Sequence, residues 1–528
     1  MRISTLLFLS FLPFLLKAQD CLGKRYQERI FSSVQVFQEV VYSQDAPSLL
    51  GSSFGAETTF DQDLVMDIYM PPPTDTVRNR PVVILAHGGG FVNIFFMGGT
   101  TLVGTKDNED VQALADTLAH WGFVAASIQY RTGFDPANGS SVKRAVWRGS
   151  QDISAGIRFF RKNAQWFGID PHKVFVGGSS AGAFACLHAA FVEESERIPE
   201  SYEQNLFTDD LGSLHSRPVV ELTGFNPFMG SNVAAQDVDS IPLAVASYWG
   251  AIADLDMLSG NNQAPVIFFH GDQDAIVDVD CARPFSSILL TAPVVCGSRP
   301  MDSVLTALNV PHQTQIEAGE GHEYWGVNNG DWGSNGPNSF WLPMIEQTAA
   351  FFYAQMRPAA PQIQGPVAAA PQQAVTYSVT QPQVGEHYCW SVQNGQIINQ
   401  NANGSQVEIE FDAGHSSAQI SLTAEDEAQL ISLPRQKGIN LQTSLANLST
   451  AQSFYRVYPQ PARQHLQIEG PAQEEQQLEL YDALGRLLRQ AQFMGQTQYF
   501  VGDLPAGQYY LRLKGAKSEA HFPIQLMD

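Results

Sequence analysis

The stretch Val174-Phe-Val-Gly-Gly-Ser-Ser-Ala-Gly-Ala183 decides the fold, because its residues predict the end of a buried strand and the start of a helix. Its centre, Gly178-Ser-Ser-Ala-Gly182, matches G-x-S-x-G in the strand–turn–helix setting that this pattern requires. Such a turn strains the backbone of its central residue, and the flanking glycines lack the side chains that would clash there. Ser180 has glycine two residues before and after it, so we predict that Ser180, and not Ser179, is a nucleophile at a helix N-terminus.

Strands and helices are predicted to alternate on both sides of this motif. Apolar runs that predict strands lie at residues 65–69, 82–86, 124–129, 174–177, 245–249, 266–270 and 314–318. Helical periods lie at residues 110–121, 150–167, 181–193 and 344–355. Several of the apolar runs are continuous, as expected for strands that are buried on both faces. The alternation predicts an α/β fold with a mostly parallel sheet.

A glycine loop follows the predicted strand at residues 82–86. In His87-Gly-Gly-Gly90, successive backbone amides can converge on one point, as an oxyanion hole requires. We expect the amides of Gly88, Gly89 and Ala181 to be the donors. His87 is expected to be structural, since it belongs to the loop that holds the glycines. A phosphate cradle would need a following Gly-Lys-Ser/Thr, which this loop lacks.

An acid and a base are expected after the serine, in that order. Asp274 lies in the acidic turn after the strand at residues 266–270, and we predict that it is the acid, with Asp272 as the alternative. His322 lies in a glycine-containing loop just past a strand and is the predicted base. With Ser180, these residues would form an acyl-enzyme from an ester. This chemistry needs no cofactor and no metal ion, and the chain has no H-E-x-x-H or C-x-x-C motif.

The N-terminal residues predict export. Arg2 precedes an apolar run at residues 6–16, which is too short to cross a bilayer, since a span needs about 20 residues. The run is typical of a signal peptide, which we place at residues 1–19. No other apolar stretch reaches spanning length, so no membrane span is expected.

The remaining chain is predicted to form three domains. The α/β region covers residues 20–357, and its stretch at 194–240 is rich in acidic, Asn and Pro residues, which suggests an insertion that acts as a lid. Residues 358–425 begin Pro-rich and continue as short alternating strands, which predicts a small β-sandwich. Residues 426–452 are predicted to be a linker, and residues 453–528 a second small all-β domain.

The net charge argues against one class of function, and the cysteine content predicts the disulfides. The chain has 30 Lys+Arg and 53 Asp+Glu, a net charge of −23, and no basic cluster, which argues against nucleic-acid binding. Its five cysteines are an odd number and too few for a disulfide scaffold. Cys281 and Cys296 are the nearest pair in the sequence, and we expect them to be bridged. Cys186 lies in an apolar run and is expected to be a buried free thiol.

Together, four motifs resemble those of the α/β-hydrolase carboxylesterases, with the greatest similarity to secreted bacterial esterase/lipase-like members. They are His87-Gly-Gly-Gly90, Gly178-Ser-Ser-Ala-Gly182, His270-Gly-Asp-Gln-Asp274 and Gly321-His322, within about residues 22–357. The resemblance implies hydrolysis of carboxylic esters. The family acts on feruloyl or acetyl groups of plant polysaccharide, on short-chain acylglycerols and on polyesters.

The C-terminal region resembles the type A sorting domain of type IX secretion. The resemblance rests on Tyr458-Pro-Gln-Pro-Ala462, Leu466-Gln-Ile468, Leu480-Tyr-Asp482 and Asp503-Leu-Pro-Ala-Gly507. It implies that the type IX machinery is a partner and that the protein is secreted or held at the cell surface. The middle module, with Tyr388-Cys-Trp-Ser-Val392 as its core strand, is similar to a PKD-like domain, which implies a spacer or a carbohydrate-binding role.

Two other functions remain open from the sequence. A serine peptidase of the prolyl-oligopeptidase type shares this fold and triad, but such enzymes carry a large N-terminal propeller. Only about 60 residues precede the first clear strand here. A non-catalytic surface protein that binds carbohydrate would not need the triad. Because every triad position and the glycine loop hold competent residues, the sequence favours the esterase.

Overall fold

A computed structural model describes the chain in nine main segments. They are residues 23–49, 59–92, 103–193, 211–224, 226–234, 238–287, 289–442, 455–482 and 485–527, the last without 516–518, together with residues 21, 196 and 198. The predicted signal peptide and residues 199–210 of the predicted insertion lie outside the described residues. The chain divides into two compact units, of which the first holds residues 1–360, 383–389 and 423–433.

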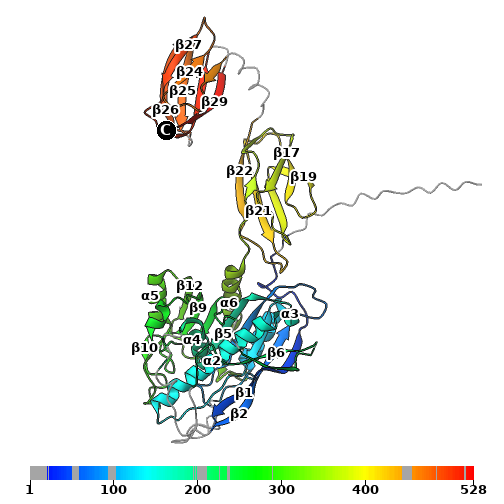
Figure 1. Cartoon of the computed structure of the whole chain (residues 1–528), viewed down its shortest axis with the longest axis vertical. Coiled ribbons are helices and arrows are strands. Elements are labelled where there is room, and N and C mark those ends of the chain that lie inside the picture. Colours follow the sequence, from blue (N-terminus) through cyan, green and yellow to red (C-terminus); the bar gives the residue numbers. More distant parts are fainter. Residues whose placement is uncertain are drawn as a thin grey trace, which may run out of the picture. The chain divides into compact units, whose positions relative to one another are not determined.

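An eight-stranded sheet forms the centre of the first unit (Figure 1). Its strand order is β1 (Gln35–Leu49), β2 (Thr59–Met70), β4 (Val124–Ile128), β3 (Arg80–Ala86), β5 (Ile169–Ser179), β8 (Val245–Tyr248), β9 (Val266–Gly271) and β12 (His312–Glu317). The strands β4, β3, β5, β8, β9 and β12 run parallel, whereas β1 and β2 are antiparallel additions at one edge. This sheet confirms the predicted α/β fold.

Helices cover both faces of the sheet. They are α1 (Glu109–His120), α2 (Gly139–Lys162), α3 (Ala164–Phe167), α4 (Ala181–Phe191), α5 (Ser298–Leu308) and α6 (Trp341–Met356). Every residue of β3 is buried, and successive residues alternate between two cores. Val82 and Ile84 pack into the core that contains α2 and α4, whereas Val83 and Leu85 pack into the core that contains α1 and α6. Burial on both faces explains the continuous apolar run of this strand.

The helix α2 begins earlier than its sequence pattern predicted. We expected a helix from residue 150, but α2 begins at Gly139, where the side chain of Asn138 accepts a hydrogen bond from the amide of Ser140. Residues 139–149 contain two glycines and four polar or charged residues near the start, which weakened the helical pattern. The N-cap therefore decides where this helix starts.

The described part of the predicted insertion forms a hairpin. Strands β6 (Val219–Leu222) and β7 (Gly230–Val233) are antiparallel, and β6 packs into the core on α2. The hydroxyl of Ser43 in β1 donates to the carbonyl of Pro218 at 2.7 Å, which holds the hairpin near the antiparallel edge of the sheet. The lid that we expected at 194–240 stays a prediction, because residues 199–210 lie outside the described part of the chain.

The middle module is built from two four-stranded sheets. One has the order β15 (Ile363–Gln364), β17 (Ala374–Val379), β20 (Gln406–Phe411), β19 (Gly395–Gln400). The other has the order β16 (Ala368–Ala369), β22 (Arg435–Leu441), β21 (Ser417–Glu425), β18 (His387–Gln393). The strand β22 lies where a linker at 426–452 was predicted. Its polar composition concealed two inward apolar residues, Ile439 and Leu441.

The C-terminal domain also has two sheets. Three strands, β23 (Arg456–Tyr458), β24 (His465–Glu469) and β27 (Gln496–Phe500), form one. The other contains β26 (Leu487–Met494), β25 (Glu475–Asp482), β28 (Gly507–Lys514) and β29 (Glu519–Leu526). Alternate residues of these strands, such as Leu478, Leu480, Leu511 and Leu513, form its core. None of the described helices combines the length and apolar character that a membrane span needs.

The turn between β21 and β22 is part of the first unit's core. Ala428 and Leu430 are buried with residues of α1 and α6. The phenol of Tyr26 donates to the carbonyl of Ala428 at 3.0 Å, and the amide of Ile431 donates to the phenol oxygen of Tyr353 at 2.8 Å. A disulfide joins Cys21 to Cys389 in the same unit, 368 residues apart in the chain. The hydrolase core is therefore completed by a segment that lies about 70 residues after its last helix.

Truncating Leu430 tests this dependence on the turn. We expect Leu430→Ala to lower the free energy of unfolding of the first unit by about 2–5 kcal/mol, because a fully buried leucine is lost. Urea unfolding followed by tryptophan fluorescence measures the change, since Trp249, Trp325 and Trp341 lie in the same core. Leu433→Ala is the matched control, because Leu433 is 58% exposed and its loss should change stability by less than about 0.5 kcal/mol. Equal effects of the two substitutions would contradict the burial of the turn.

Candidate active site

Ser180 occupies a strained turn between β5 and α4. Its φ is 51° and its ψ is −118°, a conformation that side-chain-bearing residues rarely adopt. The amide of Ser180 donates to the carbonyl of Tyr248 at 2.9 Å, which fixes the turn against β8. A Cβ at Gly178 would lie 2.4 Å from the carbonyl carbon of Gly182, and a Cβ at Gly182 would lie 2.2 Å from the carbonyl oxygen of Ala86. Both glycines are therefore required sterically.

His322 links Ser180 to Asp274. Its Nε2 lies 3.0 Å from Oγ of Ser180, and its Nδ1 lies 2.6 Å from Oδ2 of Asp274. The three residues come from the ends of β5, β9 and β12, which are brought together at the carboxyl edge of the parallel sheet. The arrangement has the donor–acceptor order of a serine–histidine–aspartate triad.

Asp274 is held as a carboxylate. Its Oδ1 accepts hydrogen bonds from the amides of Ile276 and Val277, each at 2.9 Å. Burial alone would raise the pKa of Asp274, but hydrogen bonds from His270 and His322 and the charge of His322 outweigh it and lower the pKa well below its usual value. A charged carboxylate can orient the His322 ring and stabilise its protonated form.

Asp272 has a different role from Asp274. Its Oδ1 accepts a hydrogen bond from the amide of Gly319 at 2.7 Å, so it holds the start of the loop that carries His322. It caps the loop instead of contacting the imidazole.

The glycine loop lies beside Ser180. A Cβ at Gly88 would lie 3.6 Å from Cβ of Ser180, and Gly89 and Gly90 have φ values of 95° and 60°. Among the described residues, none accepts a hydrogen bond from the amides of Gly88, Gly89 or Ala181. These amides are free to receive an acceptor, as oxyanion donors must be.

His87 fixes the shape of this loop. Its Nδ1 donates to the carbonyl of Gly88 at 2.8 Å, and its ring stacks on Tyr130 with centroids 4.3 Å apart. The phenol of Tyr130 donates to the carbonyl of His87 at 2.8 Å. Burial lowers the pKa of His87 to about 4, so the ring is neutral near pH 7. These contacts agree with a structural role for His87.

Gly104 supports the loop and was missed by sequence reasoning. A Cβ at Gly104 would lie 2.1 Å from the carbonyl oxygen of Gly88 and 2.7 Å from Nδ1 of His87. Only glycine allows this approach. Gly104 belongs to no motif and lies well after the predicted strand, so no sequence signal pointed to it.

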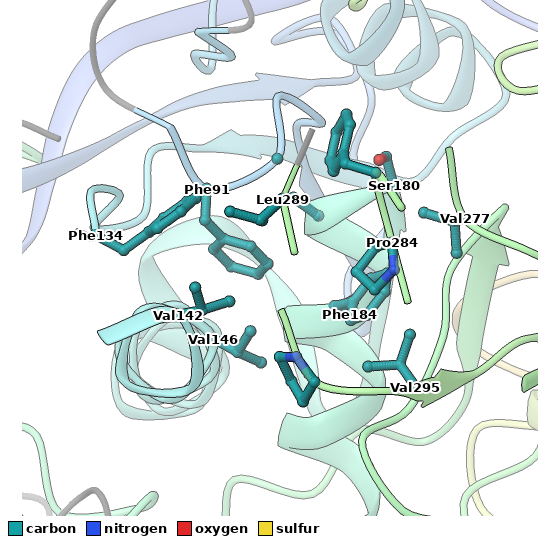
Figure 2. Close-up of a pocket in the computed structure, with 14 residues that line it drawn as sticks. Phe91, Phe134, Val142, Val146, Ser180, Phe184, Val277, Pro284, Leu289 and Val295 are labelled. Carbon is teal, nitrogen blue, oxygen red and sulfur yellow. The ribbon is translucent and has the colours of Figure 1, made fainter. Parts of the chain in front are cut away.

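An apolar cavity opens beside Ser180 (Figure 2). Its 14 lining residues are Gly90, Phe91, Phe134, Val142, Val146, Ser180, Ala181, Phe184, Val277, Pro284, Phe285, Leu289, Pro293 and Val295. Ser180 has the one polar side chain among these 14 residues, and none of the 14 side chains carries a charge. No described residue of the predicted lid lines the cavity.

The described cysteines form two disulfides. One joins Cys281 to Cys296, the pair that we expected, and the other joins Cys21 to Cys389. Cys186 is a buried free thiol whose pKa is raised by burial. One group of potential metal ligands lies close together in the described chain, Cys21, Cys389 and Glu425. Its two sulfurs are bonded to each other, so they are not available as thiolate ligands.

A strained serine between a parallel strand and a helix, linked to a histidine and a carboxylate from later strand ends, defines the α/β-hydrolase class. Within that class, residues 66–289 match the BD-FAE family. Residues 357–429 match the PKD-like domain, and residues 456–522 match the secretion system C-terminal sorting domain. All three resemblances drawn from the sequence are confirmed. The sorting domain also indicates that the protein is secreted or displayed at the cell surface.

Several curated proteins are similar to part of the chain. Carboxylesterase 3B of Mus musculus is 30% identical over 146 residues, which are 26% of this chain and 23% of that protein. Gut esterase 1 of Caenorhabditis elegans is 30% identical over 122 residues, 23% of this chain and 19% of that protein. The probable isoprenylcysteine alpha-carbonyl methylesterase ICMEL1 of Oryza sativa subsp. japonica is 31% identical over 170 residues, 31% of each chain.

The chain therefore spans about a fifth to a third of the length of these relatives. Among solved structures, esterase 2 of Thermogutta terrifontis phosphorylated by paraoxon is similar, with a TM-score of 0.35 and 17% identity. That similarity covers 58% of this chain and 95% of the other.

The two candidate acids are distinguished by substitution. Asp274→Asn should lower kcat for a p-nitrophenyl ester by about 10⁴-fold, because asparagine favours the wrong tautomer of His322. Asp272→Asn should lower it by less than about tenfold, since Asp272 contacts the amide of Gly319 and not the ring. Steady-state kinetics of both variants gives the comparison. A larger loss for Asp272→Asn would reassign the acid.

Two buried histidines predict how stability depends on pH. Burial lowers the pKa of His87 and of His188 to about 4, against about 6.5 in an unfolded chain. The pKa of each histidine is lower in the folded chain than in the unfolded chain. Its contribution to the free energy of unfolding is therefore fully present above about pH 6.5 and is lost as the pH falls towards 4. The loss is about 1.4 kcal/mol per pH unit for each histidine. Urea unfolding at pH 7 and pH 5 should show it, and His188→Gln should remove one histidine's share. An unchanged pH dependence in this variant would contradict the assignment.

Proposed function

We propose that this chain is a secreted serine carboxylic ester hydrolase that acts through an acyl-enzyme. The observation that carries the proposal is the hydrogen-bonded path from Oγ of Ser180, through His322, to Oδ2 of Asp274. The path starts at a strained serine beside an apolar cavity and ends at a carboxylate that is held in its charged form. The similarity to carboxylesterase-type proteins over part of the chain supports the same reaction class.

The first half of the proposed reaction acylates Ser180. Nε2 of His322 accepts the hydroxyl proton while Oγ of Ser180 forms a bond to the acyl carbon of the ester. Asp274 stabilises the resulting imidazolium through Nδ1. The imidazolium then gives its proton to the alcohol oxygen as the bond between that oxygen and the acyl carbon breaks.

The second half releases the acid. His322 accepts a proton from a water molecule, whose oxygen attacks the acyl carbon and displaces Oγ of Ser180, which takes the proton back. In both halves the negative oxygen would lie against the amides of Gly88, Gly89 and Ala181. Removal of one such donor costs about 3–4 kcal/mol of transition-state stabilisation in comparable enzymes.

The proposed substrates are acyl esters of polysaccharides, with feruloyl or acetyl groups, short-chain lipid esters or polyesters. The type IX secretion machinery would deliver the enzyme to these substrates, since the sorting domain is its address. The proposed chemistry uses the side chains and amides described above and involves no cofactor.

A fluorophosphonate probe tests the nucleophile. We expect it to label the full chain covalently and to label Ser180→Ala less than about 1% as fast, because the probe reacts with an activated serine hydroxyl. Ser179→Ala is the matched control, since the Ser179 hydroxyl is buried and has no hydrogen-bond partner among the described residues. Mass spectrometry of the labelled peptide identifies the site. A wild-type protein that is not labelled would favour the non-catalytic, carbohydrate-binding alternative.

A substrate panel then separates the enzyme classes. We expect hydrolysis of p-nitrophenyl esters, methyl ferulate or acetylated xylan, and no cleavage of a proline-containing peptide. Cleavage of the peptide without hydrolysis of any ester would replace the esterase by the peptidase. Loss of ester hydrolysis in Ser180→Ala ties the activity to this site.

A further inference from the structure

One wall of the cavity beside Ser180 comes from the segment Cys281–Cys296. This segment runs from β10 (Cys281–Ala282) to β11 (Val295–Cys296), which are antiparallel and joined by the disulfide. It supplies five of the 14 lining residues, Pro284, Phe285, Leu289, Pro293 and Val295. We call it the disulfide-closed segment.

The disulfide-closed segment is held at several points. Cys296 exchanges backbone hydrogen bonds with Ile252, at 2.8 and 2.9 Å. The hydroxyl of Thr291 donates to the carbonyl of Pro136 at 2.6 Å, just before α2, and the guanidinium of Arg283 donates to the carbonyl of Ala292. These contacts and the covalent link at its ends restrict the positions that this wall can adopt.

Phe285 is the part of the wall that lies nearest the glycine loop. A Cβ at Gly90 would lie 3.3 Å from the ring of Phe285, so the ring packs against the backbone next to the proposed oxyanion donors. The amide of Phe285 donates to the carbonyl of Ile276 at 2.9 Å, and its φ is 51°. The backbone that carries the ring is thus constrained.

The cavity is lined by residues beside the glycine loop and not by the loop that carries His322. The leaving alcohol must take its proton from Nε2 of His322, and no residue of the loop at 320–325 lines the cavity. The cavity is lined instead by Gly90, Phe91 and Ala181, which adjoin or include the proposed oxyanion donors. Because the leaving alcohol must face His322, whose loop does not line the cavity, we place the acyl group of the ester in the cavity.

We propose that this cavity binds an uncharged, apolar acyl group and that Phe285, on the disulfide-closed segment, limits the length of that group. The inference rests on the proposed function and adds its substrate class. Because no lining side chain is charged, an acyl group that ends in a carboxylate would lose its hydration without gaining a partner. Each methylene that the cavity buries should raise kcat/KM about fourfold.

A chain-length series tests the inference. For wild type and p-nitrophenyl esters from acetate upward, kcat/KM should rise with acyl length to a maximum and then fall, and the hemisuccinate ester should react at least tenfold more slowly than the butyrate. Phe285→Ala should shift the maximum by two or more carbons towards longer chains, because removal of a ring that lines the cavity leaves more room for the acyl group. Leu290→Ala is the matched control on the same segment, since Leu290 is 75% exposed and does not line the cavity.

The outcomes separate this inference from the proposed function. Wild-type hydrolysis that disappears in Ser180→Ala, combined with an unchanged length profile in Phe285→Ala, overturns the inference alone. A matched series of ethyl and naphthyl esters with the same acyl group varies the alcohol alone. If Phe285→Ala changes the preference of kcat/KM between these alcohols, the cavity holds the alcohol, and the inference is also overturned. A protein that hydrolyses no ester overturns both.

The double substitution Cys281→Ser with Cys296→Ser tests the role of the covalent link. It should broaden the length profile and raise KM for the optimal ester at least threefold, while the rate of fluorophosphonate labelling of Ser180 stays within about threefold of wild type. The labelling rate verifies that the variant is folded around Ser180. A retained sharp profile in a labelled variant would show that the link does not shape the wall.

Discussion

The site depends on the close approach of α4 to β3. A Cβ on Gly182 would lie 2.2 Å from the carbonyl oxygen of Ala86, so the first turn of the helix touches the end of the strand with no side chain between them. This contact places Ser180 next to Gly88, and therefore brings the proposed nucleophile and the proposed oxyanion donors to one point. Strain at Ser180 is tolerated because buried packing on both sides leaves its backbone no alternative.

The turn after β9, which contains Asp272 and Asp274, connects the proposed triad to the wall of the cavity. Oδ1 of Asp274 accepts the amide of Ile276, and the carbonyl of Ile276 accepts the amide of Phe285. The Asp274 carboxylate and the segment that carries the Phe285 ring are thus linked through Ile276 by two hydrogen bonds, one to the carboxylate and one between backbone groups. One short stretch of chain after β9 supports both Asp274 and the cavity wall, and it is hydrogen-bonded to the end of β12 and to the loop that carries His322.

Sequence could predict those parts of the site that are encoded locally. The G-x-S-x-G turn, the glycine loop and the acidic turn each lie within a few residues of a strongly apolar strand, so both their positions and their order were visible. Gly104 was not, because its role comes from a contact with Gly88 that only the folded chain creates. The docking of Ala428 and Leu430, and the pairing of Cys21 with Cys389, depend on segments hundreds of residues apart. The strand β22 was hidden by its polar composition, with only two inward apolar side chains.

The bond between Cys21 and Cys389 closes residues 21–389 into a covalent ring. Any single cut of the main chain between these two positions leaves both pieces attached to each other, so a protease that nicks an exposed loop does not detach either fragment. The turn at 426–431 is also hydrogen-bonded to Tyr26, near the start of this ring, and to Tyr353 in α6. For an exported protein, this closure keeps the two fragments of residues 21–389 together after a cut that would separate an open chain.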